Sequence, residues 1–294
     1  DSSTAMGYST IASGQGISTA MGNTTTASGF ASTTMGQLTT AIGDYSTAMG
    51  EETIASGSRS TAMGYSTRAS GGISTAMGNT TIASGFVSTT MGQLTTASGD
   101  YSTAMGANTE ASGGASTAMG SFTTANGGAS VAMGSGTSAF GYGSTTTGGS
   151  TTASGDFSTA MGSFTIASDR SSLVLGQYNS VGSTVTASAS EFSLDNTAFV
   201  IGNGSSWDNR SDALVVKFNG DATLAGNLNI NSDARLKANI ISLGSTLSKL
   251  IQIDGKSYTM KKDESEKQKI GLLAQDIEKV FPELVSESHG VKSV

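Results

Sequence analysis

The sequence predicts a mainly β protein whose N-terminal part is a stacked repeat. Glycine recurs at almost every seventh residue from Gly22 to Gly176, with Asp169 as the only break. The heptads alternate between a Ser-Thr-Ala-Met-Gly type, as at residues 46–50, and a Thr-Ile-Ala-Ser-Gly type, as at residues 53–57. Thr, Ile and Val within the heptads favour strands. The fixed period of fourteen residues therefore predicts a roll of coils, each with two short strands.

A coiled coil, the other structure with a seven-residue apolar period, does not fit these heptads. A glycine in a helix interior costs about 1 kcal/mol relative to alanine, and leucine is nearly absent from the repeats. We expect glycine to supply the positive φ of tight turns, because Asn or Asp often follows it, as in Gly22-Asn23 and Gly43-Asp44. Successive coils should then stack about 4.8 Å apart in parallel sheets.

Side-chain parity predicts which residues fill the roll, because successive side chains in a strand point to opposite faces. The residue two before glycine is usually Ala, as at Ala20 and Ala27, and the residue two before that is Ser or Thr. We expect these small residues inside. The opposite parity carries Met in one heptad type and Ser in the other. One outer face should therefore present methionine and the other serine.

The methionine column is the first candidate interface. A continuous methionine stripe along a soluble rod would be a large exposed apolar patch, so we expect it to be buried against other copies of the chain. The predicted interface residues are Met21, Met35, Met49, Met63, Met77, Met91, Met105, Met119 and Met133.

Three local features modify the array. Residues 21–50 recur almost unchanged as residues 77–106, four coils later. A one-residue insertion at Gly14-Gln15-Gly16 should lie in a turn. Leu173-Val174-Leu175 replaces the small residues, so the interior should widen there.

The array resembles the head repeats of trimeric autotransporter adhesins, the YadA-like family, whose repeats have the form Ser-Val-Ala-Ile-Gly. The resemblance covers about Ser3 to Gly176. It implies a left-handed parallel β-roll, three chains side by side, and an extracellular fibre. The methionine column, inferred above to lie between copies of the chain, would then face the axis. The chain departs from the family in having Met or Ser where that family often has Ile.

Composition limits the partners. The net charge of −7 argues against broad nucleic-acid binding through phosphate neutralisation. The absence of Cys excludes a disulfide framework and a thiolate metal site, and we predict no metal or cofactor. No apolar run reaches the roughly 18 residues of a membrane-spanning helix. The sequence begins inside a repeat without a signal peptide, so we interpret it as part of something longer.

Charge predicts a domain boundary near Asn231. Five basic residues lie before it, whereas residues 232–294 hold ten basic and nine acidic residues. We predict three domains: a roll over residues 1–176, a β-rich transition segment intertwined between chains over residues 177–231, and a small α+β domain over residues 232–294. In the transition segment, Asn219-Gly220-Asp221 is a hairpin signal. Trp207 fits packing over strand ends better than a receptor contact.

The C-terminal domain mixes helix and strand signals. The expected elements are a helix begun by Ser232-Asp233 with Leu243, Leu247, Leu250 and Ile251 on one face, a strand over Lys256–Met260, a charged loop over Lys261–Lys269, a strand over Ile270–Leu273, and a helix over Ala274–Phe281 stopped by Pro282.

Two blocks in this domain resemble the intramolecular chaperone of phage tailspikes and endosialidases, the peptidase S74 family. The first reads Ser-Asp-Ala-Arg-Leu-Lys-Ala-Asn-Ile at residues 232–240, and the second covers residues 270–285. The resemblance extends over residues 232–294, although the family usually continues into a long C-terminal helix. It implies a self-cleaving folding aid in which Ser232 is the nucleophile and Lys237 its base.

The chemistry of this pair is plausible. A Ser-Lys pair can replace Ser-His when the lysine is neutral enough to accept a proton, and burial lowers the pKa of a lysine. In the alternative interpretation, Ser232 or Asp233 only caps a helix and Lys237 is solvated; the resemblance favours the dyad. Attack on the preceding carbonyl forms a five-membered ring, so we predict cleavage between Asn231 and Ser232. A triad would depend on His289, the only histidine, and fits poorly.

Three classes of function remain open. We favour an extracellular homotrimeric fibre, either a bacterial surface adhesin or a phage tail fibre. Its repeats would bind an unidentified host-surface, matrix or glycan receptor, and its only enzymatic activity would be autocleavage. A tailspike acting on glycans would need paired carboxylates, but the array offers scattered ones such as Glu51, Glu52 and Glu110. An ice-binding repeat would need flat Thr rows, which Arg68 and Glu110 interrupt. The interrupted column runs Thr26, Thr40, Ile54, Arg68, Ile82, Thr96, Glu110 and Thr124.

Overall fold

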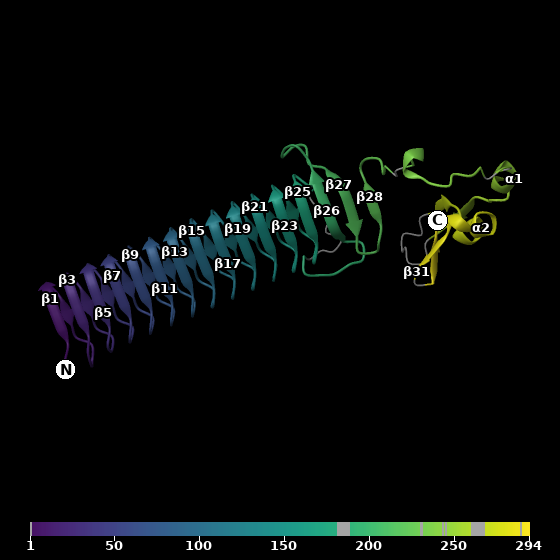
Figure 1. The fold of residues 1–294 in the computed structure, drawn as a ribbon. Coiled ribbons are helices and arrows are strands. Elements are labelled where there is room, and N and C mark those ends of the chain that lie inside the picture. The colour runs from purple at the N-terminus through teal and green to yellow at the C-terminus, as the bar shows by residue number, and fades with distance from the viewer. Residues whose placement is uncertain are drawn as a thin grey trace. The chain divides into compact units, whose positions relative to one another are not determined.

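The computed structural model describes residues 2–180, 189–229, 232–242, 244, 246–259, 268–288 and 290–294. The chain divides into two compact units, Asp1–Leu228 and Asn229–Val294. The first unit is a β-solenoid of about 12 turns with coils of about 14 residues, which confirms the predicted stacked repeat (Figure 1). The three-domain division stays a prediction.

Each coil contributes one strand of five residues and one of two residues. The long strands are β1 (Thr4–Tyr8), β3 (Thr19–Asn23), β5 (Thr33–Gln37), β7 (Thr47–Glu51), β9 (Thr61–Tyr65), β11 (Thr75–Asn79), β13 (Thr89–Gln93), β15 (Thr103–Ala107), β17 (Thr117–Ser121), β19 (Val131–Ser135), β21 (Thr145–Gly149), β23 (Thr159–Ser163) and β25 (Leu173–Gln177). The short strands are β2 (Ile11–Ala12), β4 (Thr26–Ala27), β6 (Thr40–Ala41), β8 (Ile54–Ala55), β10 (Arg68–Ala69), β12 (Ile82–Ala83), β14 (Thr96–Ala97), β16 (Glu110–Ala111), β18 (Thr124–Ala125), β20 (Ser138–Ala139), β22 (Thr152–Ala153) and β24 (Ile166–Ala167). Like strands of successive coils pair in parallel, so the solenoid has a long sheet and a short sheet.

The interior is filled as parity predicts. Ala20 in β3 and Ala27 in β4 have no exposed surface, and neither do Ser18 and Thr25, which directly precede these strands. The insertion at residues 14–16 lies in a turn, because β1 and β3 stay in register as Thr4↔Thr19 despite the extra residue. Of residues 173–175 only Val174 enters the core, so the predicted widening is limited to that one side chain.

The two glycine columns differ from the prediction in their physical role. Gly22 has a φ of 126° but lies within β3 and not in a turn, and Gly29 does not have positive φ. A Cβ on Gly29 would lie 2.2 Å from the carbonyl oxygen of Gly43 in the next coil, and a Cβ on Gly22 would lie 2.0 Å from that of Gly36. Glycine therefore recurs in both heptad types because adjacent coils approach too closely for a side chain, and in the first type the positive φ favours glycine as well.

Positive φ falls mainly on non-glycine residues two positions after each glycine. Thr24 and Tyr45 have φ values of 55° and 58°. This left-handed conformation directs their N–H groups along the stack: Thr24 donates to Tyr8 O at 2.8 Å and Tyr45 to Phe30 O at 2.7 Å. The backbone hydrogen-bond ladder thus continues through both turns.

The last coil is closed by polar side chains. Asn179 acts like an added strand at the edge of the short sheet: its Oδ1 accepts from Ile166 N at 2.8 Å and its Nδ2 donates to Ile166 O at 3.0 Å. Pairing of this kind satisfies backbone groups at an otherwise open sheet edge.

The transition segment continues the long sheet. Strand β26 (Thr197–Asn203) pairs in parallel with β25, whereas β27 (Asp212–Lys217) and β28 (Ala222–Leu224) add antiparallel. The predicted hairpin turn is confirmed: Lys217 N donates to Asp221 O at 2.8 Å, and Gly220 has a φ of 91°.

Trp207 lies in the loop between β26 and β27. Its ring is edge-on to that of Phe164 with centroids 5.7 Å apart, and the Arg210 guanidinium lies 4.7 Å from its centroid. Phe164 directly follows β23, so Trp207 packs at a strand end as predicted, but 63% of its surface remains exposed.

The second unit consists of short elements. They are η1 (Ala234–Leu236), α1 (Thr246–Leu250), β29 (Lys256–Tyr258), β30 (Lys269–Gly271), α2 (Ala274–Val280), η2 (Pro282–Leu284), β31 (Ser286–Ser288) and β32 (Val291–Ser293). The helix at Ser232-Asp233 is a single 3-10 turn, and α1 ends before Ile251; Leu243, Met260 and residues 261–267 lie outside the described residues. The predicted helix that Pro282 stops is confirmed as α2 (Ala274–Val280). Among the described residues, no helix is long and apolar enough to cross a membrane.

Candidate functional site

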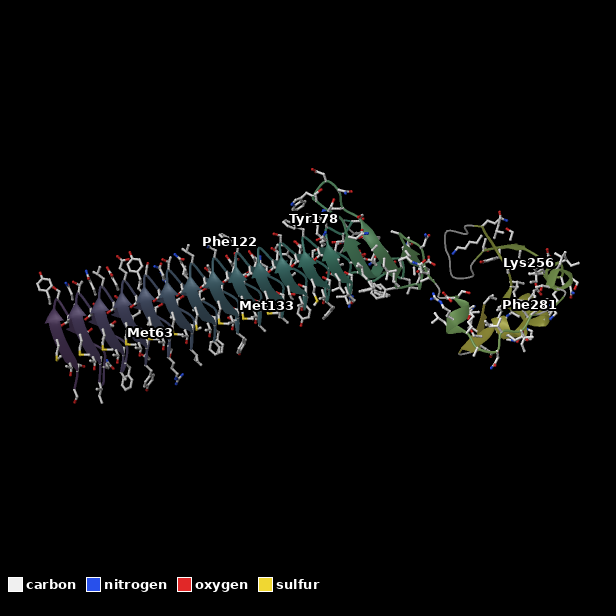
Figure 2. The ribbon with its side chains drawn as sticks, turned by 45° about the horizontal axis from the view of Figure 1, so that its top comes forward. Met63, Phe122, Met133, Tyr178, Lys256 and Phe281 are labelled. Atoms are coloured by element: carbon white, nitrogen blue, oxygen red, sulfur yellow. The ribbon has the colours of Figure 1, made fainter. Side chains whose placement is uncertain are left out.

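The methionine column lies on the outer face of the long sheet, at the middle of each long strand. Met21 is in register with Met35, and the same pairing continues along the stack. Figure 2 shows Met63 and Met133 along the same side of the rod. The side chains are partly exposed in the single chain, and Met91 is 38% exposed. The predicted shared outer face is therefore confirmed, whereas its position at a three-fold axis stays a prediction.

The apolar column is longer than predicted. Met6 pairs with Met21, and Met161 takes the same place after Thr147, which is the one polar member of this part of the column. Beyond Met161 aliphatic side chains replace methionine, first in the last coil of the roll and then in the transition segment. These continuing members are Leu175, Ile201, Leu214 and Leu224. Strand parity alone could have found Met6 and Met161.

The outer face of the short sheet mixes threonine, isoleucine and charged side chains. Arg68 lies in register between Ile54 and Ile82, and Glu110 lies between Thr96 and Thr124. Both charged side chains are exposed, as the predicted interruptions of the Thr row require. In the described part of the chain, no group of three or more His, Cys, Asp or Glu side chains could hold a metal ion.

Ser232 and Lys237 are brought together in the second unit. The single turn of η1 separates them in the chain, and Lys237 is its C-cap, with its N–H donating to Ala234 O at 3.1 Å. This turn folds the lysine back, so that Lys237 Nζ donates a hydrogen bond of 2.8 Å to Ser232 Oγ. Both side chains are exposed, so the chain alone does not enclose the pair. Asn231 and His289 lie outside the described residues.

Asp233 performs the capping that was the alternative role for this segment. Its Oδ1 accepts from the backbone N–H of Arg235 at 2.8 Å, and its carboxylate pairs with the Arg235 guanidinium at 2.7 Å. The Arg235 side chain, followed by its backbone N–H, lowers the pKa of the Asp233 carboxyl below its usual value. Because Asp233 satisfies the cap, the Ser232 hydroxyl is free to contact Lys237 instead.

The second unit also exposes an unusual amount of apolar surface. Only Ile277 and Phe281 are buried apolar side chains among its described residues. Exposure exceeds 80% at Ile241 and Ile270. A depression of about 400 Å³ opens beside Phe281, lined by Thr246, Leu250, Phe281, Glu283 and Leu284. A soluble domain of this size usually covers such surface with a partner.

Comparisons with known families agree with both halves of the chain. The YadA head domain repeat, a model of two copies, matches residues 41–67, 88–109, 111–137, 141–165 and 153–179. The Peptidase_S74 model, described as the chaperone of endosialidase, matches residues 232–286. No curated protein matches the chain. The chain therefore carries YadA head repeats within residues 41–179 and a peptidase S74 chaperone domain over residues 232–286.

These domains define a class of protein. YadA head repeats indicate an adhesin, and the S74 domain indicates assistance with trimer folding. Both domains are of a trimeric type. Adhesin or fibre domains imply a protein that is surface-exposed or extracellular.

Proposed function

We propose that this chain forms a homotrimeric extracellular fibre that attaches to a surface through its repeat rod. The C-terminal domain would assist trimer assembly and then cut the chain between Asn231 and Ser232. The observation that carries this proposal is the apolar column, which extends from Met6 through the transition segment to Leu224 on one face of the long sheet.

A symmetric trimer explains this column. Excluding water from one face of each rod would stabilise the assembly, because the full burial of a methionine side chain contributes roughly 1.5–3 kcal/mol of free energy. Thioether side chains adapt to irregular gaps, so one in-register column from each of three chains can interdigitate. A single seam, interrupted only at Thr147, favours one continuous interface over separate contacts in rod and transition segment.

The chaperone role follows from the folding problem that such a fibre poses. Each coil pairs with coils only fourteen residues away in its own chain, so the roll itself has contacts of low sequence separation. The slow step would be the alignment of three separate chains, because assembly depends on their concentration. A C-terminal domain that associates first would hold three chains in register. The exposed apolar side chains of the second unit, among them Ile241 and Ile270, fit this role because association would cover them.

Autocleavage would separate this folding aid from the finished fibre. Ser232 would attack the carbonyl carbon of Asn231 while Lys237 accepts the hydroxyl proton. The bond from Asn231 C to Ser232 N then breaks, the amine leaves with a proton, and water releases the ester that remains. The hydrogen bond of 2.8 Å between Lys237 Nζ and Ser232 Oγ supports this pairing. Enclosure of the pair between chains of the trimer would keep water away from the reacting groups.

The proposed function is tested with the full-length chain displayed on bacterial cells. We expect the displayed chain to attach cells to cultured host cells, and the purified chain to have the mass of a trimer by light scattering. A monomeric chain, or display without attachment, would contradict the proposal.

A further inference from the structure

A longer repeat places pairs of aromatic rings at one turn edge of the rod. The segment 21–50, which recurs at 77–106, has a third and more diverged copy at 133–162. Each copy contributes two rings from adjacent coils in an edge-to-face contact, with centroids 5.3 to 5.7 Å apart. The pairs are Phe30–Tyr45, Phe86–Tyr101 and Tyr142–Phe157. We call them the aromatic pairs.

The first ring of each pair is held in place from two sides. The backbone N–H that carries it donates to an aspartate of the next coil, as Phe30 N does to Asp44 Oδ1 at 2.9 Å. The preceding coil has a glycine beneath the ring, where a Cβ would lie only 2.8 to 3.2 Å from ring atoms. The equivalent aspartates are Asp44, Asp100 and Asp156, and the glycines are Gly16, Gly72 and Gly128.

These rings are exposed although their positions are fixed. Between 43% and 61% of each ring residue remains accessible. Other turns of the same edge carry Ala115 and Ala129 at the position of Tyr45, so the fold itself does not need a ring there. Fixed and exposed aromatic side chains are characteristic of binding surfaces, because little conformational entropy is lost when they are covered.

The first pair lines a depression with the chemistry of a sugar site. Its volume is about 600 Å³, within the range of small-molecule sites. The lining residues are Ser13, Gln15, Ser28, Phe30, Asp44 and Tyr45. Flat apolar rings surrounded by hydroxyl, amide and carboxyl groups match a sugar, which has an apolar C–H face and a rim of hydroxyls.

Charge favours a neutral ligand over an acidic one. An aspartate accompanies all three pairs, and none of the residues lining the first depression is basic. Arg59 lies 5.7 Å from the Tyr45 ring centroid and Arg170 lies 5.7 Å from that of Phe157, so a cation is not common to the three pairs. We propose that the aromatic pairs are repeated subsites for a neutral polysaccharide, which is the receptor class for the attachment function proposed above.

The spacing of the aromatic pairs fits one long ligand, or many copies of a ligand on a surface. Pairs four coils apart lie roughly 19 Å apart along the rod at about 4.8 Å per coil. A trimer would present nine such subsites. Linked subsites raise the overall affinity by about 10²–10⁴ without a new contact, so each subsite can be weak.

The test uses the full-length trimer in solution against immobilised dextran, mannan and galactan, with chondroitin sulfate and collagen as comparisons. The ring variant combines Tyr45→Ala, Tyr101→Ala and Phe157→Ala, positions where other coils already have Ala. The control variant combines Tyr8→Ala, Tyr65→Ala and Phe122→Ala, which are exposed unpaired rings at or directly after the last residue of a long strand; Figure 2 labels Phe122. We expect binding to at least one neutral polysaccharide, weakened about 100-fold or more in the ring variant and within about twofold of wild type in the control.

Several outcomes would overturn this inference. They are the absence of binding to all three neutral polysaccharides, binding unaffected by the ring variant, ring-dependent binding of chondroitin sulfate or collagen alone, or loss of the trimer in the ring variant, which would place the rings between chains. Attachment to cultured cells separates the two proposals: equal attachment of the ring variant and wild type contradicts the glycan subsites but leaves the attachment function standing.

Discussion

The carboxyl group of Asp169 accepts a hydrogen bond of 2.9 Å from the backbone N–H of Thr197, at the one heptad position where glycine is replaced. It also accepts from the Thr197 hydroxyl. One coil earlier, a Cβ on Gly155 would lie 2.3 Å from Asp169 O, so a side chain is excluded there. At Asp169 the stacked neighbour is Thr197, and the carboxyl group joins the transition segment to the roll.

This contact predicts that a glycine at position 169, which would restore the repeat, makes the protein less stable. Asp169→Gly recreates the heptad but leaves the part-buried Thr197 N–H without its acceptor, and the loss of a partner costs a fully buried group about 1–3 kcal/mol. We expect the melting temperature of the full-length trimer to fall. The melting temperature of Asp169→Asn, which keeps one acceptor oxygen, should fall less. Equal stability of Asp169→Gly and wild type would contradict the role of this contact.

The close-approach glycines predict a second, larger effect. In Gly85→Ala the new Cβ would lie 2.0 Å from the carbonyl oxygen of Gly99, so the stacked coils must separate. We expect a loss of about 3 kcal/mol or more, measured by denaturant unfolding. Gly149→Ala is the matched control, because no heavy atom lies within 4 Å of its Cβ. Comparable destabilisation by both substitutions would show that the effect is not steric.

The sequence could predict this sheet architecture, but not why each glycine is needed. Period and parity identify Ser18 and Ala20 as interior residues, since both depend only on spacing along one strand. Spacing alone cannot show that Gly22 and Gly29 both face a carbonyl oxygen of the neighbouring coil, or that only Gly22 also has positive φ. The hydrogen bonds of Asp169 and Asn179 could not be predicted either, because their partners lie on other coils or segments.

Buried hydroxyl groups provide a third prediction. The Thr81 hydroxyl is buried and has no hydrogen-bond partner among the residues that the structure describes, whereas Ser88 Oγ donates to Gly85 O at 2.7 Å. Thr81→Val keeps the shape and removes an unpaired polar group, so the free energy of unfolding should rise by about 1 kcal/mol. Ser88→Ala should lower it by about 1 kcal/mol. A loss of stability in Thr81→Val would mean that this hydroxyl is satisfied in solution.

The methionine column predicts the oligomeric state. Met49→Asp, Met63→Asp and Met77→Asp together place three carboxylates per chain in the proposed interface, where desolvation without a partner is costly. We expect the combined variant to have the mass of a monomer by light scattering. The matched variant places Asp at Ser56, Ser70 and Ser84 on the other face and should stay trimeric. A trimeric methionine variant would refute the interface.

Sequence resemblance found the Ser232–Lys237 pair, and the structure explains how so short a segment can form it. One 3-10 turn, capped by Asp233, brings Lys237 Nζ within 2.8 Å of Ser232 Oγ. The enclosure that the chemistry needs was not predictable from these residues, because within one chain both side chains are exposed. Because Ser232 and Lys237 are exposed within one chain, we expect trimer assembly to enclose them before cleavage.

The dyad is tested by the products of the full-length trimer, weighed by mass spectrometry. Ser232→Ala and Lys237→Ala should each stop cleavage between Asn231 and Ser232 without unfolding the rod, since neither side chain belongs to the roll core. Lys237→Arg is the sharper variant: it keeps the charge and the ability to donate to Ser232, but it cannot act as a base, so it should also stop cleavage. Asp233→Ala removes only a cap worth about 1 kcal/mol and should still be cleaved. Cleavage in Ser232→Ala, or full cleavage in Lys237→Arg, would rule out the dyad and leave the domain with its chaperone role alone.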